Sequence, residues 1–160
     1  MMTRGKLSQI DNPSKRLRSR ALYYLAKREY SASELKEKLK TYTIELNLNQ
    51  DDLGNLIAEL QKQNLQSDDR FCESYINSKK NKFGILRLQH DLAQKGISED
   101  IISIYINSLR DDEYNFALGV WQKKFDAPAK DQNEKAKQIR FMQGRGYGYE
   151  IINKIINKQK

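Results

Sequence analysis

The sequence predicts an all-α protein made of three tandem three-helix repeats. Strand-forming residues are scarce, because the 160-residue chain has one valine, Val120, and threonine only at positions 3, 41 and 43. Apolar residues instead recur at intervals of three and four, which is the period of a helix. A stretch of the chain also reappears fifty positions later with its residue types in order. Because each repeat contacts only its neighbours, we expect the three repeats to form an elongated, curved array.

Nine helices are expected, at residues 14–28, 32–40, 50–63, 68–80, 85–95, 98–109, 111–125, 131–144 and 147–157. In the first repeat, Pro13 precedes the first helix, Ser31 and Glu34 form a capping box at the second, and Asn49 caps the third. The apolar stripes of these helices are Leu22, Leu25 and Ala26, then Leu35 and Leu39, then Leu53, Leu56, Ile57 and Leu60. Residues 41–49 predict a longer loop than in the other repeats, so the first repeat is a degenerate copy.

The later helices have start signals of the same kind. Ser67 and Ser98 each precede two acidic residues, which suit the positive end of a helix, and two further acids begin the helix at 111–125. Trp121 and Phe125, four residues apart, are expected in the core of the third repeat. Cys72 lies inside a helical pattern and is expected to be a buried small hydrophobe.

The internal repeat is clearest between residues 92–102 and 142–152. The two stretches match in apolar, basic, glycine, acidic and paired isoleucine positions. Gly96 and Gly146 are therefore each expected to end a helix in the left-handed conformation. The resulting domains are a basic, flexible N-terminal arm at 1–13 and three-helix repeats at 14–65, 66–110 and 111–160.

The positive charge is concentrated at the N-terminus. The chain has a net charge of +8, and residues 1–28 contain eight Lys and Arg residues against one acid, Asp11, which makes +7 for that stretch. Such a run suggests a polyanionic partner or an acidic protein surface. The alternative is a solvated arm that only improves solubility.

The usual catalytic and metal-binding constellations are absent from the sequence. His90 is the single histidine and Cys72 the single cysteine, so neither a two-histidine metal site nor a disulfide within the chain is available. The glycine-rich stretch 144–148 lacks a preceding strand and is interpreted as a helix end with a short connection, the alternative being a nucleic-acid-binding loop. We expect no enzyme activity, no cofactor, no metal and no membrane span, and a monomer in the reducing cytoplasm.

Four segments, in the same order, resemble the RecX family of regulatory proteins. RALYYLAKRE at 20–29 followed by YSASELKEKL at 30–39 resembles the family's opening, and DDRF at 68–71 resembles a central segment shortened by one residue. GILRL at 84–88, together with Lys95 and Gly96, is similar to a family segment that begins with glycine and ends with lysine and glycine. RFMQGRGYGYEII at 140–152 is similar to the closing segment of the family. The resemblance covers about residues 16–157. The chain departs from the family in Leu88, in Asp91, and in the polar stretch 41–49.

The resemblance implies tandem three-helix repeats that bind the filament of RecA recombinase on single-stranded DNA. Such a protein lies along the filament groove and damps ATP hydrolysis, strand exchange and co-protease activity, without a catalytic residue. The contact candidates are Arg70, Lys79 and Arg87, which match family positions, together with Lys95, Lys137, Arg140 and Arg145. The alternative for Arg70 is a structural role in which it pairs with a nearby carboxylate. The alternative for the other cations is that they lie on a solvated helix face. A stand-alone module that binds single- or double-stranded DNA and a scaffold for an unrelated partner are the competing functions.

Overall fold

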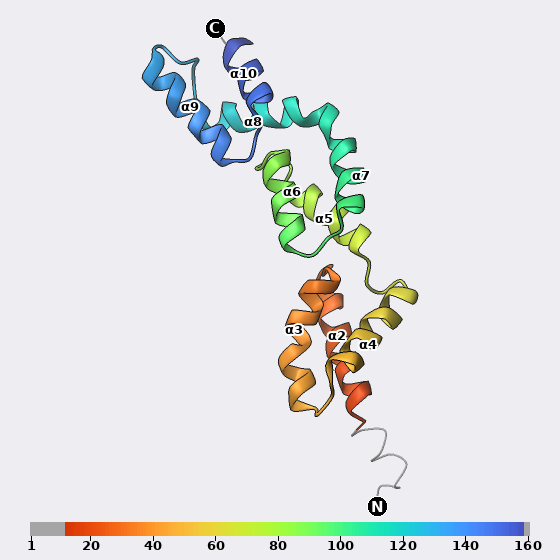
Figure 1. Cartoon of the computed structure of the whole chain (residues 1–160). Helices are drawn as coiled ribbons and strands as arrows, with labels where there is room; N and C mark the ends of the chain where they lie inside the picture. The colour runs from red at the N-terminus through yellow and green to blue at the C-terminus, as the bar shows by residue number, and fades with distance from the viewer. Residues whose placement is uncertain (1–11, 159–160) are drawn as a thin grey trace, which may run out of the picture. The chain divides into compact units, whose positions relative to one another are not determined.

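The computed structural model describes residues 12–158, and these residues are helical without a strand (Figure 1). The elements are α2 Pro13–Lys27, α3 Ala32–Glu45, α4 Gln50–Lys62, α5 Asp68–Lys79, α6 Ile85–Gln94, α7 Glu99–Leu109, the 3-10 helix η1 Arg110–Asp112, α8 Glu113–Lys124, α9 Gln132–Gly144 and α10 Tyr149–Lys158. Each predicted helix has a counterpart among them, so the all-α prediction is confirmed. Nearly all of the predicted arm at 1–13 lies outside the described residues.

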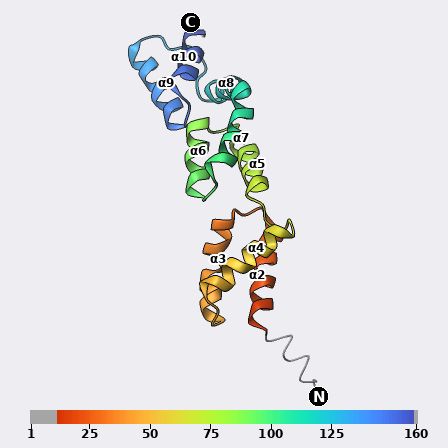
Figure 2. The ribbon, with the colours of Figure 1, turned by 45° about the vertical axis from the view of Figure 1, so that its right-hand side comes forward.

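The chain divides into two compact units, residues 1–71 and 72–160, with the division inside α5. In the first unit α3 packs against both α2 and α4 (Figure 2). The centre of its core is formed by leucines that are at most 2% exposed: Leu17, Leu35, Leu39, Leu53 and Leu60. The stripes predicted for α3 and α4 therefore form the core, whereas Leu22 and Leu25 of α2 are only partly buried beside it.

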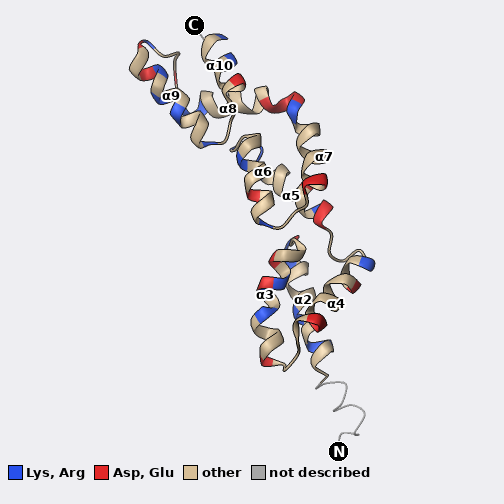
Figure 3. Ribbon diagram, viewed as in Figure 1, with Lys and Arg blue, Asp and Glu red and all other residues tan. Residues whose placement is uncertain are grey.

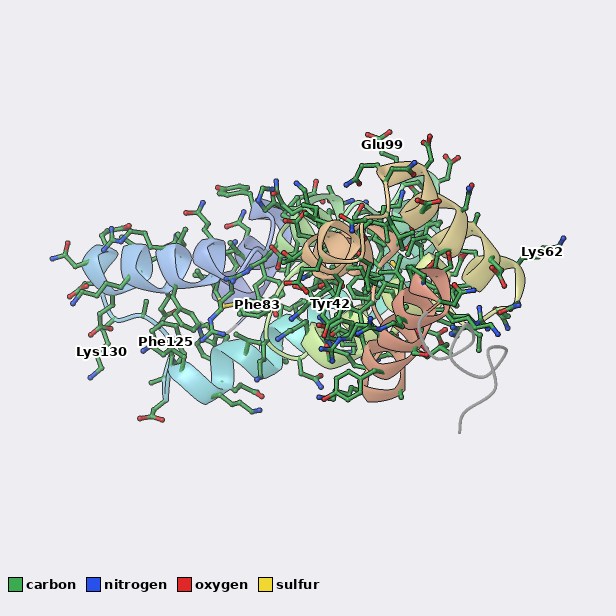
Figure 4. The ribbon with its side chains drawn as sticks, turned by 90° about the horizontal axis from the view of Figure 1, so that it is seen from below. Tyr42, Lys62, Phe83, Glu99, Phe125 and Lys130 are labelled. Carbon is green, nitrogen blue, oxygen red and sulfur yellow. The ribbon has the colours of Figure 1, made fainter. Side chains whose placement is uncertain are left out.

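The second unit has α6 packed on α7, and α10 packed on both α8 and α9. Trp121, Met142, Tyr147, Ile152 and Ile155 form the centre of the α8–α10 core. Trp121 is buried as predicted, and Phe125 is partly buried between α8 and α9 (Figure 4). Cys72 is fully buried, as expected for a small core residue. Within residues 12–158 none of the helices combines the length and the apolar character needed to cross a membrane.

The helix starts predicted at Ser31 and Asn49 are confirmed in atomic detail, whereas Asp111 and Asp112 lie in η1 and α8 begins at Glu113 without a side-chain cap. The Ser31 hydroxyl accepts from the Glu34 amide at 3.0 Å, and the Glu34 carboxylate accepts from the Ser31 amide at 3.1 Å. Asn49 and Asp52 make the same reciprocal pair at 2.8 Å in both directions. These caps satisfy amides that a helix leaves free at its first turn, so local sequence alone is enough to position the ends.

The glycine turns are also confirmed. Gly96 has φ 78° and Gly146 has φ 94°, both in the left-handed region. In each turn the residue after the glycine donates back to the helix, Ile97 to the Leu92 carbonyl at 3.1 Å and Tyr147 to the Met142 carbonyl at 3.2 Å. This pattern closes a helix by satisfying its last carbonyl groups.

The prediction of a long loop at residues 41–49 is wrong. Helix α3 continues to Glu45, and Asn47 adopts φ 58°, the conformation of the two glycines. The Leu48 amide donates to the Thr43 carbonyl at 2.9 Å, so this turn has the same hydrogen-bond pattern as the turns at Gly96 and Gly146. Thr43 is tolerated inside the helix because its side chain is buried and its hydroxyl donates to the Leu39 carbonyl at 2.8 Å. The first repeat is thus a closer copy than its sequence indicates.

Candidate functional site

Two of the predicted contact residues, Arg87 and Arg145, come together on the second unit around Phe83. The guanidinium carbon of Arg87 lies 3.9 Å from the centre of the Phe83 ring, and that of Arg145 lies 5.6 Å from it. Arg87 also lies 3.7 Å from the Asp91 carboxylate, one helical turn along α6. Both arginines are partly accessible, so an anion can reach them while the ring holds their planes in place.

Backbone pairing between α6 and the turn after α9 produces this arrangement. The Gly84 amide donates to the Arg145 carbonyl at 2.8 Å, and the Leu86 amide donates to the Gly146 carbonyl at 3.0 Å. A Cβ atom at Gly84 would lie 2.5 Å from the Gly146 oxygen, and one at Gly146 would collide with Arg87. The two glycines are therefore needed for the close approach that brings residues 87 and 145 together.

An open pocket of about 430 Å³ adjoins Arg145. It is lined by Asn81, Lys82, Val120, Lys123, Lys124, Phe141 and Arg145, and we call it the basic pocket. These described residues include four cations and no carboxylate. The centre of the Phe141 ring lies 5.4 Å from the Lys124 amine and 5.2 Å from the Arg145 guanidinium carbon. A positive hollow with an aromatic wall suits an anion that has a flat or apolar part.

The other predicted residues are dispersed. Lys137 and Arg140 are exposed on α9, where Figure 3 shows bands of positive charge, and Lys79 is half-buried at the end of α5. The Lys95 amine lies 5.7 Å from the Tyr75 ring. These residues do not form one cluster with the basic pocket.

Arg70 is engaged within the first unit. Its guanidinium donates to the Glu29 carboxylate and to both the main-chain and side-chain oxygens of Asn64, each at 2.9 Å. Asp68 accepts from the Ala32 amide at 2.9 Å and so joins α5 to the start of α3. The contacts of Arg70 match the structural alternative, a pairing with a carboxylate.

Sequence reasoning missed the aromatic components of the site, Phe83 and Phe141. A signal exists in hindsight, because Phe83 stands between Lys82 and a glycine and therefore in a connection rather than a helix core. Among residues 12–158 there is no group of three or more His, Cys, Asp and Glu residues placed to hold a metal ion, and His90 is exposed. The chemistry that the geometry supports is binding of anions.

Comparison with known proteins identifies the family. Residues 67–104 match the family profile described as RecX, second three-helix domain, and residues 111–156 match RecX, third three-helix domain. The regulatory protein RecX of Neisseria meningitidis serogroup C is 39% identical over 140 residues, which cover 88% of each chain. The chain belongs to the RecX family. The regulatory protein RecX of Ralstonia nicotianae, 33% identical over 88% of this chain and 86% of its own, is a second relative.

The fold is also that of solved RecX structures. The crystal structure of RecX from Lactobacillus salivarius superposes with a TM-score of 0.78 over 92% of this chain and 97% of that one, at 21% identity. The helical repeat array predicted from the sequence and the resemblance to RecX are thus confirmed. The basic pocket takes Lys82 from the second RecX domain, and its remaining cations, Lys123, Lys124 and Arg145, from the third.

Proposed function

We propose that this RecX-family chain is a non-enzymatic modulator, mainly an inhibitor, of RecA recombinase. It binds along the groove of the RecA–single-stranded DNA filament and damps ATP hydrolysis, strand exchange and co-protease activity. The observation that carries the proposal is the basic pocket with Arg87, Phe83 and Arg145, in a chain of a regulatory family. It acts as a monomer in the cytoplasm.

Repetition gives a physical reason for binding a filament. When similar binding surfaces recur along one chain and the target is itself periodic, several weak contacts add up to a high avidity. Positive surface also speeds the encounter with a polyanionic assembly. Lys79, Lys95, Lys137 and Arg140 are proposed as further contacts, whereas the contacts of Arg70 within the chain make it the weakest candidate.

The test is a titration of the full chain into preformed recombinase filaments, with ATP hydrolysis and strand exchange as readouts. We expect inhibition at less than one chain per protomer. The double variant Lys123→Glu with Lys124→Glu is expected to weaken inhibition about tenfold or more, equivalent to about 1.4 kcal/mol. The matched control, Lys36→Glu with Lys62→Glu, makes the same charge change at exposed positions of the first unit; Lys62 points outward in Figure 4. Equal losses in both double variants would contradict a role for the basic pocket.

A stand-alone DNA-binding module is the second candidate, favoured by the four cations of the basic pocket. A direct binder that neutralises several phosphates shows an affinity that falls steeply with salt, with a logarithmic slope of about −0.7 per phosphate on single strands. Steep salt dependence on bare DNA, combined with no effect on filament ATP hydrolysis, would favour this candidate. Inhibition of filaments by the full chain supports the recombinase modulator, whatever its affinity for bare DNA.

A further inference from the structure

Helix α2 in the first unit has a stripe of cations and one tyrosine on a single face. The fifteen residues Pro13–Lys27 contain five Lys and Arg residues and no acid. Arg16, Arg20, Tyr23 and Lys27 follow one another at intervals of four, three and four residues, so they share a face of the helix. This α2 stripe is roughly 16 Å long at the helical rise per residue. The stripe belongs to residues 1–28, which are rich in Lys and Arg and poor in acids. The basic pocket does not include these residues, so it does not account for their charge.

The tyrosine of the stripe is exposed and surrounded by cations. Tyr23 is 49% exposed, the Lys27 amine lies 4.2 Å from its ring centre, and the Arg20 guanidinium carbon lies 5.4 Å from it. From α3, Tyr42 fixes Arg20: its ring centre is 4.3 Å from the guanidinium carbon, and its hydroxyl accepts a hydrogen bond from Arg20. Arg20, in the middle of the stripe, is therefore positioned by the fold of the first unit.

Within the described residues no ion pair neutralises the stripe. The first unit's ion pairs join Arg18 to Glu59, Arg28 to Glu34, and Arg70 to Glu29, and these involve none of the stripe residues. A hydrogen bond from Lys27, followed by the charges of Lys27 and Arg20, holds the pKa of Tyr23 below its usual range. The phenol therefore lies in a positive potential, which attracts anions.

We propose that the α2 stripe is a binding site for single-stranded nucleic acid, with Arg16, Arg20 and Lys27 on successive phosphates and the Tyr23 ring stacked against a base. An exposed ring beside regularly spaced cations is the arrangement that single-strand binders use. Lys27 is a flexible side chain, and a base stack outweighs its contact with an exposed ring, so Lys27 moves to a phosphate when a base arrives. A duplex offers phosphates to the cations but keeps its bases stacked away from Tyr23.

The site is independent of the proposed regulation of the recombinase. It lies on α2 in the first unit, and its readout is binding of bare oligonucleotide, without recombinase. The basic pocket lies in the second unit, and its readout is inhibition of filaments. Either proposal can fail while the other stands.

The experiment measures binding of the full chain to a labelled oligothymidylate by fluorescence anisotropy. Tyr23→Ala is expected to weaken binding about tenfold, and Tyr23→Phe to stay within about twofold of the wild type, because stacking needs only the ring. Tyr149→Ala is the matched control, since Tyr149 is an even more exposed tyrosine, at 68%, in the second unit. Circular dichroism spectra check that each variant is folded.

Two further arms separate stacking from charge. An abasic oligomer of the same length should bind the wild type about as weakly as oligothymidylate binds Tyr23→Ala. Arg16→Ala with Lys27→Ala should reduce the logarithmic salt slope by about 1.4, or 0.7 per lost phosphate contact, while Lys36→Ala with Lys62→Ala leaves it unchanged. Equal binding of the abasic oligomer, or an equal loss in Tyr149→Ala, overturns the proposal. Poly-glutamate is added as a competitor of the oligonucleotide. If it displaces the oligonucleotide completely, and its own binding needs the stripe cations but not Tyr23, the proposal is overturned in favour of an acidic protein surface.

Discussion

Tyr147 is a core tyrosine whose hydroxyl has no hydrogen-bond partner among the described residues. Burial, followed by the charge of Glu113, raises its pKa to about 12 from 10.0. Below pH 10 the hydroxyl is neutral in both the folded and unfolded states. As the pH rises towards 12 the unfolded chain ionises first, so stability present below pH 10 is lost across this window.

Tyr147→Phe is therefore expected to reduce the alkaline loss of stability between pH 10 and 12. At neutral pH the change should be neutral or stabilising by up to about 1 kcal/mol, because it removes a buried polar group without a partner. Urea unfolding at pH 7 and at pH 10–12 measures both effects. A loss of more than about 1 kcal/mol at pH 7 would mean that the hydroxyl is hydrogen-bonded in solution.

Two neighbouring glycines differ sharply in what a side chain would meet. Gly146 has φ 94° and no room for a Cβ atom beside Arg87, whereas nothing lies within 4 Å of one at Gly144. Gly146→Ala should lower the free energy of unfolding by about 2–4 kcal/mol, from backbone strain and overpacking. Gly144→Ala, the control, should raise it by about 0.5 kcal/mol. Similar effects of the two substitutions in urea unfolding would contradict the close approach of α6 to residue 146.

At the scale of elements, the turn between α3 and α4 depends on one residue, Asn47. Its left-handed backbone is tolerated by asparagine and glycine but strained for other residues. Asn47→Gly should be neutral, and Asn47→Ala should destabilise the first unit by about 1 kcal/mol. Thermal unfolding of the two variants compares them directly. An alanine variant as stable as the glycine variant would show that the turn relaxes.

The elements show where sequence reasoning works and where it stops. The capping boxes at Ser31 and Asn49 and the left-handed Gly96 and Gly146 were predictable, since each depends on residues within one turn. The helical continuation through Thr43 was not. Threonine is a weak helix former, and here its side chain is buried and its hydroxyl donates to the Leu39 carbonyl; a linear pattern does not contain that burial.

At the scale of the whole molecule, the elongated form expected from three repeats stays a prediction. A compact protein of this length has a radius of gyration of about 15 Å. Small-angle X-ray scattering of the full chain should give a clearly larger value, because repeats that contact only their neighbours add length rather than thickness. A value near 15 Å would contradict the extended array.

The candidate site, which comprises the basic pocket and the Phe83 cluster beside it, was only partly predictable. Arg87 and Arg145 were candidates from their charge and, for Arg87, from the family pattern, but they are 58 positions apart in the sequence. Their meeting at Phe83 depends on hydrogen bonds between the Gly84 and Gly146 turns, which no local motif announces. Arg70 shows the converse, since an arginine at a family position has three structural hydrogen bonds.

By itself, the sequence determined the helical class, the ends of most helices, the fifty-residue repeat and the membership of the RecX family. These features depend on residue periodicity and on contacts within a few positions, which a linear pattern contains. Tertiary structure decided which cations are free to bind and which are held within the chain, and it brought Phe83, Arg87 and Arg145 together. The reason is that the electrostatic role of an arginine depends on its neighbours in space, and packing between helices alone selects those neighbours.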